Sequence, residues 1–434
     1  MHQQCLACVA YRLFVRIAFL VSSFGGLASA AGNWPQWRGP QADGVAAASD
    51  ATGGYPIEFS ADKNVAWKVE LPGRGSSTPA VWGDAIYVTC GIDGQDALVC
   101  YDLASREQWR RLLGPEIAGK HPHGSGSNPS PATDGRHVVV FYKSGTVACF
   151  DLDGKELWRT NLRERYGDIN MWWDLGASPV IAGDRAIVQV LHAGESYLVA
   201  LDLESGEVLW KQPRQYVVPV EADQSYASPQ LATVDGRQIV VILGADHVTG
   251  HDVATGELLW ECGGLNPENQ QMWRNIASVA IADGMAIVPY GRGDFMVALR
   301  LDGTGDVTAT HKVWEQQGVG SDVPTPAVRD GCIYVLHDQG RLACLDLQTG
   351  DELWSANLPK SRHKCFASPV LAGDLLYSAR LDGTVFVGRV TDAGYEPLAE
   401  NAMGEELVVG PVPVRGGLLI RGPEHLWRIG PSQK

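Results

Sequence analysis

The sequence predicts an all-β fold, an eight-bladed β-propeller made of four-stranded blades. The main observation is a segment that recurs along the chain and ends each time in tryptophan, as in ALDLESGEVLW at residues 200–210. Further copies end at Trp109, Trp158, Trp260 and Trp354, and a degenerate copy ends at Trp314. Successive tryptophans lie 49, 52, 50, 54 and 40 residues apart, and these spacings are typical of propeller blades.

A second signal precedes these tryptophans by about 30 residues, where a small hydroxyl residue followed by proline opens a strand. These anchors are Thr78 with Pro79, Ser130 with Pro131, Ser178 with Pro179, Ser228 with Pro229, Thr325 with Pro326, and Ser368 with Pro369. In the fifth unit Ser278 is followed by Val279, and Val412 with Pro413 is expected to open the eighth. Gly/Asp turns alternate with β-branched runs between the anchors, so each unit is expected to form four strands.

The last unit is one strand short. It has strands at residues 418–421 and 425–429, but no residues remain for a fourth. Residues 64–71, NVAWKVEL, precede the first anchor and contain Trp67. We expect this N-terminal strand to complete the last blade, because closing the ring leaves no exposed sheet edge.

The N-terminus has the features of a secretory signal peptide. Residues 1–30 contain Arg12 and Arg16, no acidic residue, an apolar run, and a small-residue end that predicts cleavage after Ala30. We therefore expect a periplasmic or secreted protein with no transmembrane segment after cleavage. Residues 31–63 are predicted to be an extended arm, whose Trp34 and Trp37 pack on the propeller wall or dock a partner, and residues 64–434 the propeller.

Charge and cysteine content narrow the classes of partner. Removing the signal peptide leaves 33 basic and 50 acidic residues, a net charge of −17, which excludes nucleic acid and anionic membranes as partners. A monomer is expected.

Cys100, Cys149 and Cys344 occupy one repeat position and are interpreted as small core residues. Cys90 and Cys100 flank a predicted hairpin and could form a disulfide in an oxidising compartment.

The candidate site lies on the face formed by the loops that lead into the first strand of each blade. These loops are long, polar and aromatic, which is typical of binding surfaces. The candidate ligand or partner-binding residues are His121, His123, Asn128, Trp172, Trp173, Asp174, Asp223, Gln224, Arg274, Asn275, Asp322, His363 and Lys364. The competing interpretation is that these loops are simply solvated, and no catalytic residue is assigned.

Three local patterns in the chain suggest ligands. Trp172 and Trp173 are adjacent and point opposite ways in an extended segment, which leaves one free to stack on a ligand. His121 and His123 have the residue type of metal ligands but no fixed third ligand, so no metal is predicted. Asp302 and Asp306 could ligate calcium, although a plain turn explains them as well.

The repeats at residues 200–210 and 250–260 combine a small residue, Asp, Ser/Thr-Gly-Glu and Trp, and they resemble the tryptophan-docking motif of PQQ repeats. The resemblance covers nearly all of residues 64–430. It implies that the tryptophans stack between neighbouring blades. The implied docking residues are Trp67, Trp109, Trp158, Trp210, Trp260, Trp314 and Trp354.

Two branches share this repeat. The BamB-like propellers lack a cofactor and help assemble outer-membrane β-barrels, but the lipid-anchor cysteine of that branch is missing here. The quinoprotein alcohol dehydrogenases use PQQ and calcium, a vicinal cysteine pair and a catalytic Asp; this chain has no adjacent cysteines. In that reading Asp174 or Asp322 would be the base.

We therefore predict a non-catalytic secreted or periplasmic propeller without a cofactor. It is expected to act as a binding or assembly scaffold for an envelope protein, a peptide or a small-molecule ligand. The alternatives are a PQQ- and calcium-dependent dehydrogenase and a carbohydrate-binding propeller.

Overall fold

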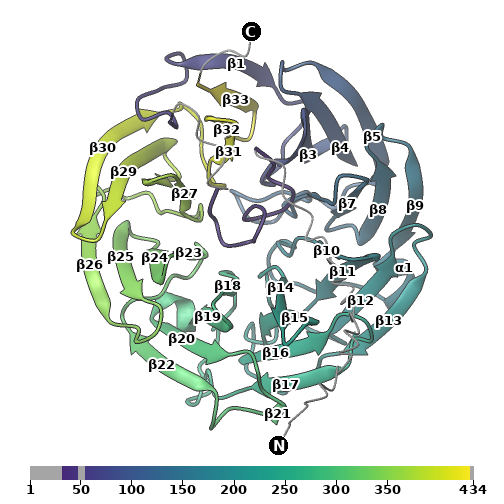
Figure 1. Ribbon diagram of the computed structural model, residues 1–434. Coiled ribbons are helices and arrows are strands. Elements are labelled where there is room, and N and C mark those ends of the chain that lie inside the picture. The colour runs from purple at the N-terminus through teal and green to yellow at the C-terminus, as the bar shows by residue number, and fades with distance from the viewer. Residues whose placement is uncertain (1–31, 47–53, 431–434) are drawn as a thin grey trace, which may run out of the picture.

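Eight β-sheets surround a central channel in the computed structural model, which describes residues 32–46 and 54–430 (Figure 1). Each sheet is a four-stranded antiparallel blade, and one has a fifth strand. The prediction of an all-β, eight-bladed propeller is therefore confirmed. The predicted signal peptide lies outside the described residues. None of the described helices is long and apolar enough to span a membrane.

The first four blades follow one another along the chain, each running from its inner to its outer strand. Blade 1 comprises β2 (Ala80–Trp82), β3 (Ala85–Ile92), β4 (Gln95–Asp102) and β5 (Glu107–Pro115). Blade 2 comprises β6 (Ala132–Thr133), β7 (His137–Phe141), β8 (Thr146–Asp151) and β9 (Glu156–Asn161). Blade 3 comprises β10 (Val180–Ala182), β11 (Arg185–Val190), β12 (Tyr197–Asp202) and β13 (Val208–Pro213). Blade 4 comprises β14 (Gln230–Val234), β15 (Arg237–Gly244), β16 (His247–Asp252) and β17 (Leu258–Cys262).

The remaining blades repeat this order, with one exchange at the end. Blade 5 comprises β18 (Ala280–Ala282), β19 (Met285–Tyr290), β20 (Phe295–Arg300) and β22 (Lys312–Gln317). Blade 6 comprises β23 (Ala327–Arg329), β24 (Cys332–Leu336), β25 (Arg341–Asp346) and β26 (Glu352–Asn357). Blade 7 comprises β27 (Val370–Ala372), β28 (Leu375–Ala379), β29 (Thr384–Thr391) and β30 (Gly394–Ala402). Blade 8 comprises β31 (Val412–Val414), β32 (Gly417–Arg421), β33 (His425–Ile429) and β1 (Val65–Glu70). Three minor elements lie between these strands: α1 (Leu162–Tyr166), η2 (Gly291–Gly293) and β21 (Gly305–Asp306).

The N-terminal strand closes the ring, as the sequence predicts. β1 pairs antiparallel with β33, so that Trp67 lies opposite Arg428 and Val69 opposite Leu426.

The expected eighth anchor is wrong by two residues. β31 begins at Val412, so Gly410 and Pro411 occupy the anchor position. Pro413 lies inside β31, where an inner edge strand tolerates the missing N–H group.

The hydroxyl anchors are linked from blade to blade. The backbone N–H of each anchor donates to the side-chain hydroxyl of the next, at 2.8–3.0 Å. The chain of bonds runs from Thr78 through Ser130, Ser178, Ser228, Ser278 and Thr325 to Ser368. We call these seven residues the hydroxyl ring. Ser278 keeps both of its links although Val279 replaces the proline, and the ring opens at blade 8 because Gly410 has no hydroxyl.

The core lies between blades. One cluster of buried side chains, for example, joins Tyr87 and Leu98 of blade 1 to Val138 and Phe150 of blade 2. Five of the repeat tryptophans also join neighbouring blades, because Nε1 of each donates to a backbone carbonyl of the following blade at 2.7–3.1 Å. These pairs are Trp67 with Leu103, Trp109 with Leu152, Trp158 with Leu203, Trp210 with Val253, and Trp314 with Leu347.

The glycine in the receiving turn is required by this docking. A Cβ on Gly206 would lie 2.6 Å from the ring of Trp158, and the residue has φ of +72°. Trp260 and Trp354 depart from the expected geometry. Trp260 is buried over Gly250 of its own blade, and its Nε1 has no partner among the described residues. The degenerate turn of blade 5 instead adds β21 beside β17. Trp354 stacks on Tyr395 of blade 7 with 6.3 Å between ring centroids.

The N-terminal arm crosses the channel rather than lying along the outer wall. In Figure 1 its described part, residues 32–46, runs through the middle of the ring. Trp34 pairs with Val81 of blade 1, and Val45 with Leu371 of blade 7. The buried Arg38 guanidinium donates to the carbonyls of Pro326 and Pro369, both at 2.6 Å. The arm therefore ties blade 1 to blades 6 and 7, which are not its neighbours, at one end of the channel.

The hypothesis of a disulfide between Cys90 and Cys100 is wrong. All seven cysteines in the described part of the chain are free thiols. Cys90 packs with the side chains between blades 8 and 1, whereas Cys100 packs with those between blades 1 and 2. The two thiols thus lie on opposite faces of the same sheet. Cys100, Cys149 and Cys344 are buried opposite Trp109, Trp158 and Trp354, where a small side chain fits.

Docked tryptophans should dominate stability between blades. We expect Trp158→Ala to lower the free energy of unfolding by about 3–5 kcal/mol, since it empties a buried space. Trp158→Phe should cost about 1 kcal/mol because the hydrogen bond to Leu203 is lost. The smaller buried ring area should lower the free energy of unfolding further. Leu209→Ala, on the exposed outer strand, should cost under about 0.5 kcal/mol. Urea unfolding measures all three; equal losses for Trp158→Ala and Leu209→Ala would contradict tryptophan docking.

A buried carboxyl group should make stability depend on pH. Asp96 at the start of β4 is fully buried and accepts a hydrogen bond from the Ser144 hydroxyl. Burial raises the Asp96 pKa to about 7, against the bond from Ser144, which lowers it. In the unfolded chain the Asp96 carboxyl has its ordinary, lower pKa. The protonated carboxyl therefore stabilises the folded state at low pH, and this contribution is lost as the pH rises through about 7. Asp96→Asn should therefore raise the melting temperature more at pH 8 than at pH 4. A gain that is equal at both pH values would contradict the raised pKa.

Candidate functional site

A cavity of about 610 Å³ occupies the channel between the arm and the loops that lead into the blades. Trp34, Trp37 and Arg38 of the arm line one end, and six members of the hydroxyl ring line the wall. Nine of the predicted loop residues line the cavity: His121, His123, Asn128, Trp173, Asp174, Arg274, Asp322, His363 and Lys364. The repeat thus brings side chains from five different entering loops to one space.

The four remaining predicted residues lie elsewhere. Trp172 and Gln224 line a neighbouring cavity of about 450 Å³ between the entering loops of blades 2 to 4. Asp223 and Asn275 line neither cavity, and Asn275 is buried at the base of its loop. Both tryptophans line this neighbouring cavity, and Trp173 lines the central cavity as well.

Residues 119–124, GKHPHG, form what we call the HPH loop. It belongs to the loop that leads from blade 1 into blade 2, and it also contacts the entering loops of blades 1, 7 and 8. Arg74 donates to the Pro122 carbonyl at 2.5 Å, and His123 Nδ1 lies 3.0 Å from Glu406. The His121 ring meets Trp173 edge-on at 5.3 Å and Phe366 at 6.4 Å. The HPH loop therefore covers part of the channel mouth, and burial lowers the pKa of His121, with His123 adding to the effect.

Asp174 holds the HPH loop in place. Its carboxylate accepts hydrogen bonds from the backbone of Lys120 at 2.8 Å and of His121 at 3.0 Å. It also forms an ion pair with Lys143 at 2.7 Å, in which the two side chains are 3% and 10% exposed. Three donors thus engage three of the roughly four lone pairs of Asp174, so its visible role is to position the loop.

A second group of charges surrounds Arg274 on the entering loop of blade 5. Arg274 lies 3.0 Å from Asp322 and 4.0 Å from Glu221, and Arg292 lies 3.8 Å from Asp322. The Glu221 side chain is fully buried with φ of +65°, an unusual conformation for a non-glycine residue. Burial raises the Glu221 pKa, while Arg274 and Arg292 oppose the shift. Arg274 thus supplies the positive charge that these two carboxylates require.

Sequence reasoning missed several of these residues. Phe366 and Arg362, which flank the predicted His363 and Lys364, also line the cavity. Arg362 and Phe366 could have been found from the sequence because they lie within two residues of the predicted His363 and Lys364. Trp37 lines the cavity as well, but only the path of the arm shows it, because nothing in NWPQWRGP predicts a course through the channel.

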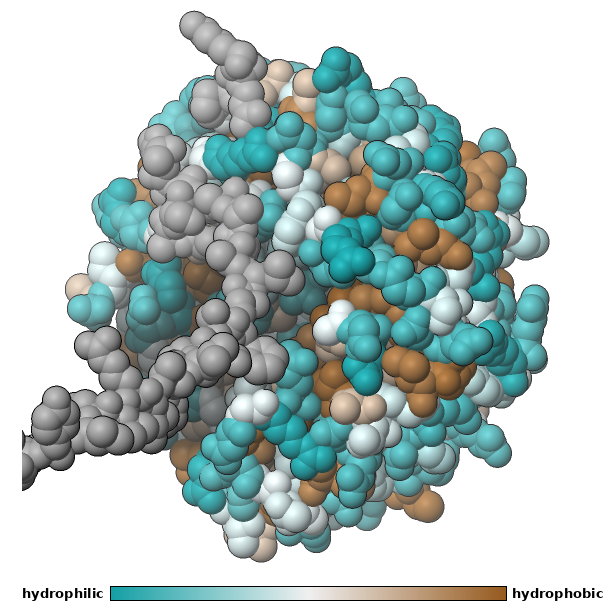
Figure 2. Space-filling model, turned by 45° about the vertical axis from the view of Figure 1, so that its right-hand side comes forward, coloured by the Kyte–Doolittle hydropathy of each residue, from teal (hydrophilic) through white to brown (hydrophobic). Residues whose placement is uncertain are grey.

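Exposed apolar side chains gather on three entering loops. Ten large hydrophobic residues of the described chain are exposed, and five of them, Leu112, Leu209, Leu258, Val313 and Leu353, lie singly on outer strands. The other five, Ile117, Trp172, Trp173, Val217 and Val220, all belong to the entering loops of blades 2, 3 and 4. We call these the docking rim. Most of the surface seen in Figure 2 is hydrophilic, with separate hydrophobic groups.

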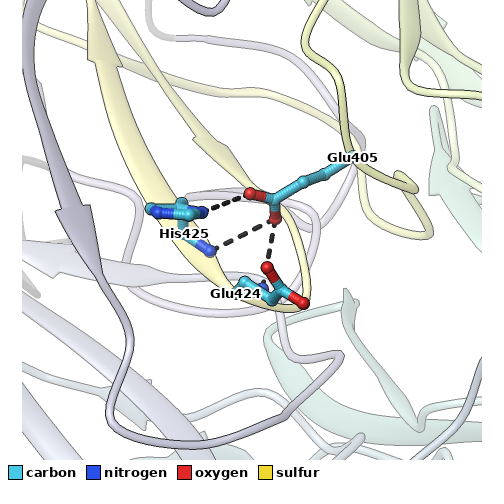
Figure 3. Close-up of side chains that lie close together, drawn as sticks. All are labelled: Glu405, Glu424 and His425. Carbon is cyan, nitrogen blue, oxygen red and sulfur yellow. Dashed lines mark hydrogen bonds and ion pairs between the residues drawn. The ribbon is translucent and has the colours of Figure 1, made fainter.

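Side chains of the types that can bind a metal come together at one place in the described residues, away from the cavity lining. There Glu405, Glu424 and His425 bring three potential ligand atoms within 4.8 Å (Figure 3). The Glu405 carboxylate already accepts from the backbone N–H groups of Glu424 at 3.2 Å and His425 at 3.3 Å, and contacts His425 Nδ1. It therefore clamps the turn between β32 and β33. Asp306 caps its own turn through Thr308, and Asp302 lies 3.4 Å from His311.

The carboxylates of the cavity lining are not arranged as a calcium site. A calcium site needs several oxygen ligands that converge on one point. Asp174 is paired with Lys143, and Asp322 with Arg274, so fixed cations already balance both candidate bases. The cavity-lining carboxylates of the described chain form no group of three close ligand atoms.

The chain matches the model of a family described as outer membrane protein assembly factor BamB, over residues 39–226 and 143–392. The BamB of Burkholderia pseudomallei is 24% identical over 357 residues, which cover 78% of this chain and 82% of that protein. The BamB of Yersinia pestis is 26% identical over 263 residues, 58% of this chain and 60% of that protein. A polyvinylalcohol dehydrogenase of Sphingopyxis sp. is 24% identical over 375 residues, 68% of this chain and 55% of that protein.

Solved structures show the same fold. BamB from Moraxella catarrhalis has a TM-score of 0.61 at 17% identity, covering 84% of this chain and 98% of that one. The quinohemoprotein alcohol dehydrogenase of Comamonas testosteroni has a TM-score of 0.66 at 14% identity, covering 94% and 82%. At these identities the likeness concerns the fold alone, whereas the family match extends over well over half of the chain. This protein therefore belongs to the BamB family of PQQ-like β-propellers.

Proposed function

We propose that this protein is a non-catalytic scaffold of the bacterial envelope that docks a protein partner on its entering-loop face. The docking rim is the observation that carries this proposal. Trp172 is 44% exposed and Trp173 37%, although large aromatic side chains are normally buried in a propeller whose core lies between blades. Exposed apolar groups beside polar loops are typical of protein interaction sites. The family description supports an assembly role.

The rim has the composition of an interface centre. Aromatic side chains contribute most to binding when a partner covers them, and charged neighbours then set orientation. Ile117, Trp172 and Trp173 line one cavity together, so a side chain of the partner can insert between them. Trp172 N donates to the Gln224 side chain at 2.6 Å, which holds the entering loops of blades 3 and 4 together. The rim is thus held by hydrogen bonds before a partner arrives.

The rim should be the site of contact in cells. A photo-crosslinking amino acid at Trp172 or Val217 should form adducts with a protein of the outer membrane assembly machinery. The same amino acid at Leu353, 53% exposed on an outer strand, is the matched control and should form none. Adducts from Leu353 alone, or adducts of equal yield and identity from all three positions, would contradict docking at the rim.

The cofactor-free reading makes a separate prediction. Titration with PQQ in calcium-containing buffer should leave the melting temperature within about 1 °C of the starting value, because ligand binding to the native state raises it. Tryptophan fluorescence should show no saturable quenching. A quinoprotein dehydrogenase serves as the positive control. A calcium-dependent rise in melting temperature would revive the dehydrogenase alternative, and a rise with oligosaccharides in the same assay would favour carbohydrate binding.

A further inference from the structure

The lining of the central cavity has an excess of positive groups in a protein that is acidic overall. Its titratable lining comprises two acidic residues, Asp174 and Asp322, against the cations Arg38, Arg274, Arg362 and Lys364 and the histidines His121, His123 and His363. The whole chain has 50 acidic and 35 basic residues. The cavity lining therefore carries a net positive charge, whereas the whole chain carries a net negative charge.

The two acidic groups are already neutralised. Asp174 is paired with Lys143, and Asp322 with Arg274. Arg38 is satisfied by backbone carbonyls of the inner strands. Arg362 and Lys364, on the entering loop of blade 7, are exposed and have no acidic partner within 4.0 Å in the described parts of the chain. These two cations are available to a ligand.

The hydroxyl ring adds hydrogen-bond donors deeper in the channel. Each of Ser130, Ser178, Ser228 and Ser278 accepts a backbone N–H of the preceding blade through its side-chain oxygen. One lone pair of each hydroxyl oxygen is thus engaged, while each hydroxyl proton can still be donated. All four line the cavity. A ligand that reaches this level meets hydroxyl donors, which suits carboxylate oxygens.

The cavity is continuous with the docking rim. Trp173 belongs both to the rim and to the cavity wall, where it contacts His121. A volume of about 610 Å³ falls within the range of ligand cavities, about 300–1,000 Å³, and is too small for a folded domain. An extended segment of a protein bound on the rim can therefore continue past Trp173 into the channel.

We propose that the central cavity binds an acidic peptide segment of the docked partner. Its carboxylates are held by Arg362 and Lys364 at the mouth, and the leading carboxylate reaches the hydroxyl ring. This inference rests on the proposed function, because the segment belongs to the protein that the rim binds. Salt screens charges beyond about 8 Å at physiological ionic strength. The attraction between the cavity cations and the peptide carboxylates therefore acts within the cavity, and the acidic outer surface does not cancel it.

The direct test is fluorescence anisotropy of a labelled hexaglutamate peptide with the full mature chain. We expect saturable binding at 50 mM NaCl that weakens about tenfold or more at 500 mM, since the contacts are charge pairs. A labelled hexaglutamine peptide should not bind. Lys364→Glu should weaken hexaglutamate binding about tenfold, and Arg362→Glu with Lys364→Glu should abolish it. Lys155→Glu, an equal charge change on an exposed turn of blade 2, should leave the affinity within about twofold.

Three results would overturn the inference: no hexaglutamate binding at low salt, equal binding of hexaglutamine, or equal losses from Lys364→Glu and Lys155→Glu. Citrate bound in the cavity without any peptide binding would overturn the peptide as occupant. Melting temperatures of the variants check that they fold. The proposed function fails separately: crosslinks from Trp172 without peptide binding leave the docking rim standing, and peptide binding without crosslinks leaves the cavity without its protein partner.

Discussion

The structure depends on the burial of each blade against its two neighbours. The apolar clusters lie between sheets, so no blade has a core of its own and an open ring would expose two sheet faces. Three devices hold the ring closed: β1 completes blade 8, tryptophans donate from one blade to the next, and the hydroxyl ring links the inner strands. The arm adds a fourth, because Arg38 and Trp34 connect blades that are not neighbours.

Repetition explains why the fold could be predicted from the sequence and also where prediction failed. The Trp and hydroxyl-proline positions recur in register because every blade solves the same packing problem, so even Trp67, far from the C-terminus, could be assigned to blade 8. The failures occur where a blade departs from the repeat. Gly410 lacks the hydroxyl that would have marked the eighth anchor, and the longer turn of blade 5 left Trp260 without a receiving carbonyl. The arm lies outside the repeats, so no repeated pattern predicts its path through the channel.

The candidate site was predictable as a face but not as a set of contacts. Propeller topology places every entering loop at one end of the channel, which is why nine of thirteen candidates line the same cavity. It does not say how far a loop reaches. The HPH loop leads into blade 2 but contacts Glu406 of the loop entering blade 8, which depends on Asp174 binding its backbone rather than on any local pattern. Burial of Glu221 beside Arg274 likewise follows from packing among three loops.

The same fold occurs in assembly factors and in dehydrogenases, so the fold alone does not separate them and the side chains of the site must be compared. Buried carboxylates need compensating positive charge, and a protein can supply it with a bound metal or with a fixed side chain. In this chain Lys143 compensates Asp174, and Arg274 compensates Asp322 and Glu221. Such pairs rigidify the walls, and they leave Arg362 and Lys364 as the cations free to act on a ligand. In this arrangement the buried pairs shape the cavity, and the exposed cations Arg362 and Lys364 stand where an entering ligand would meet them.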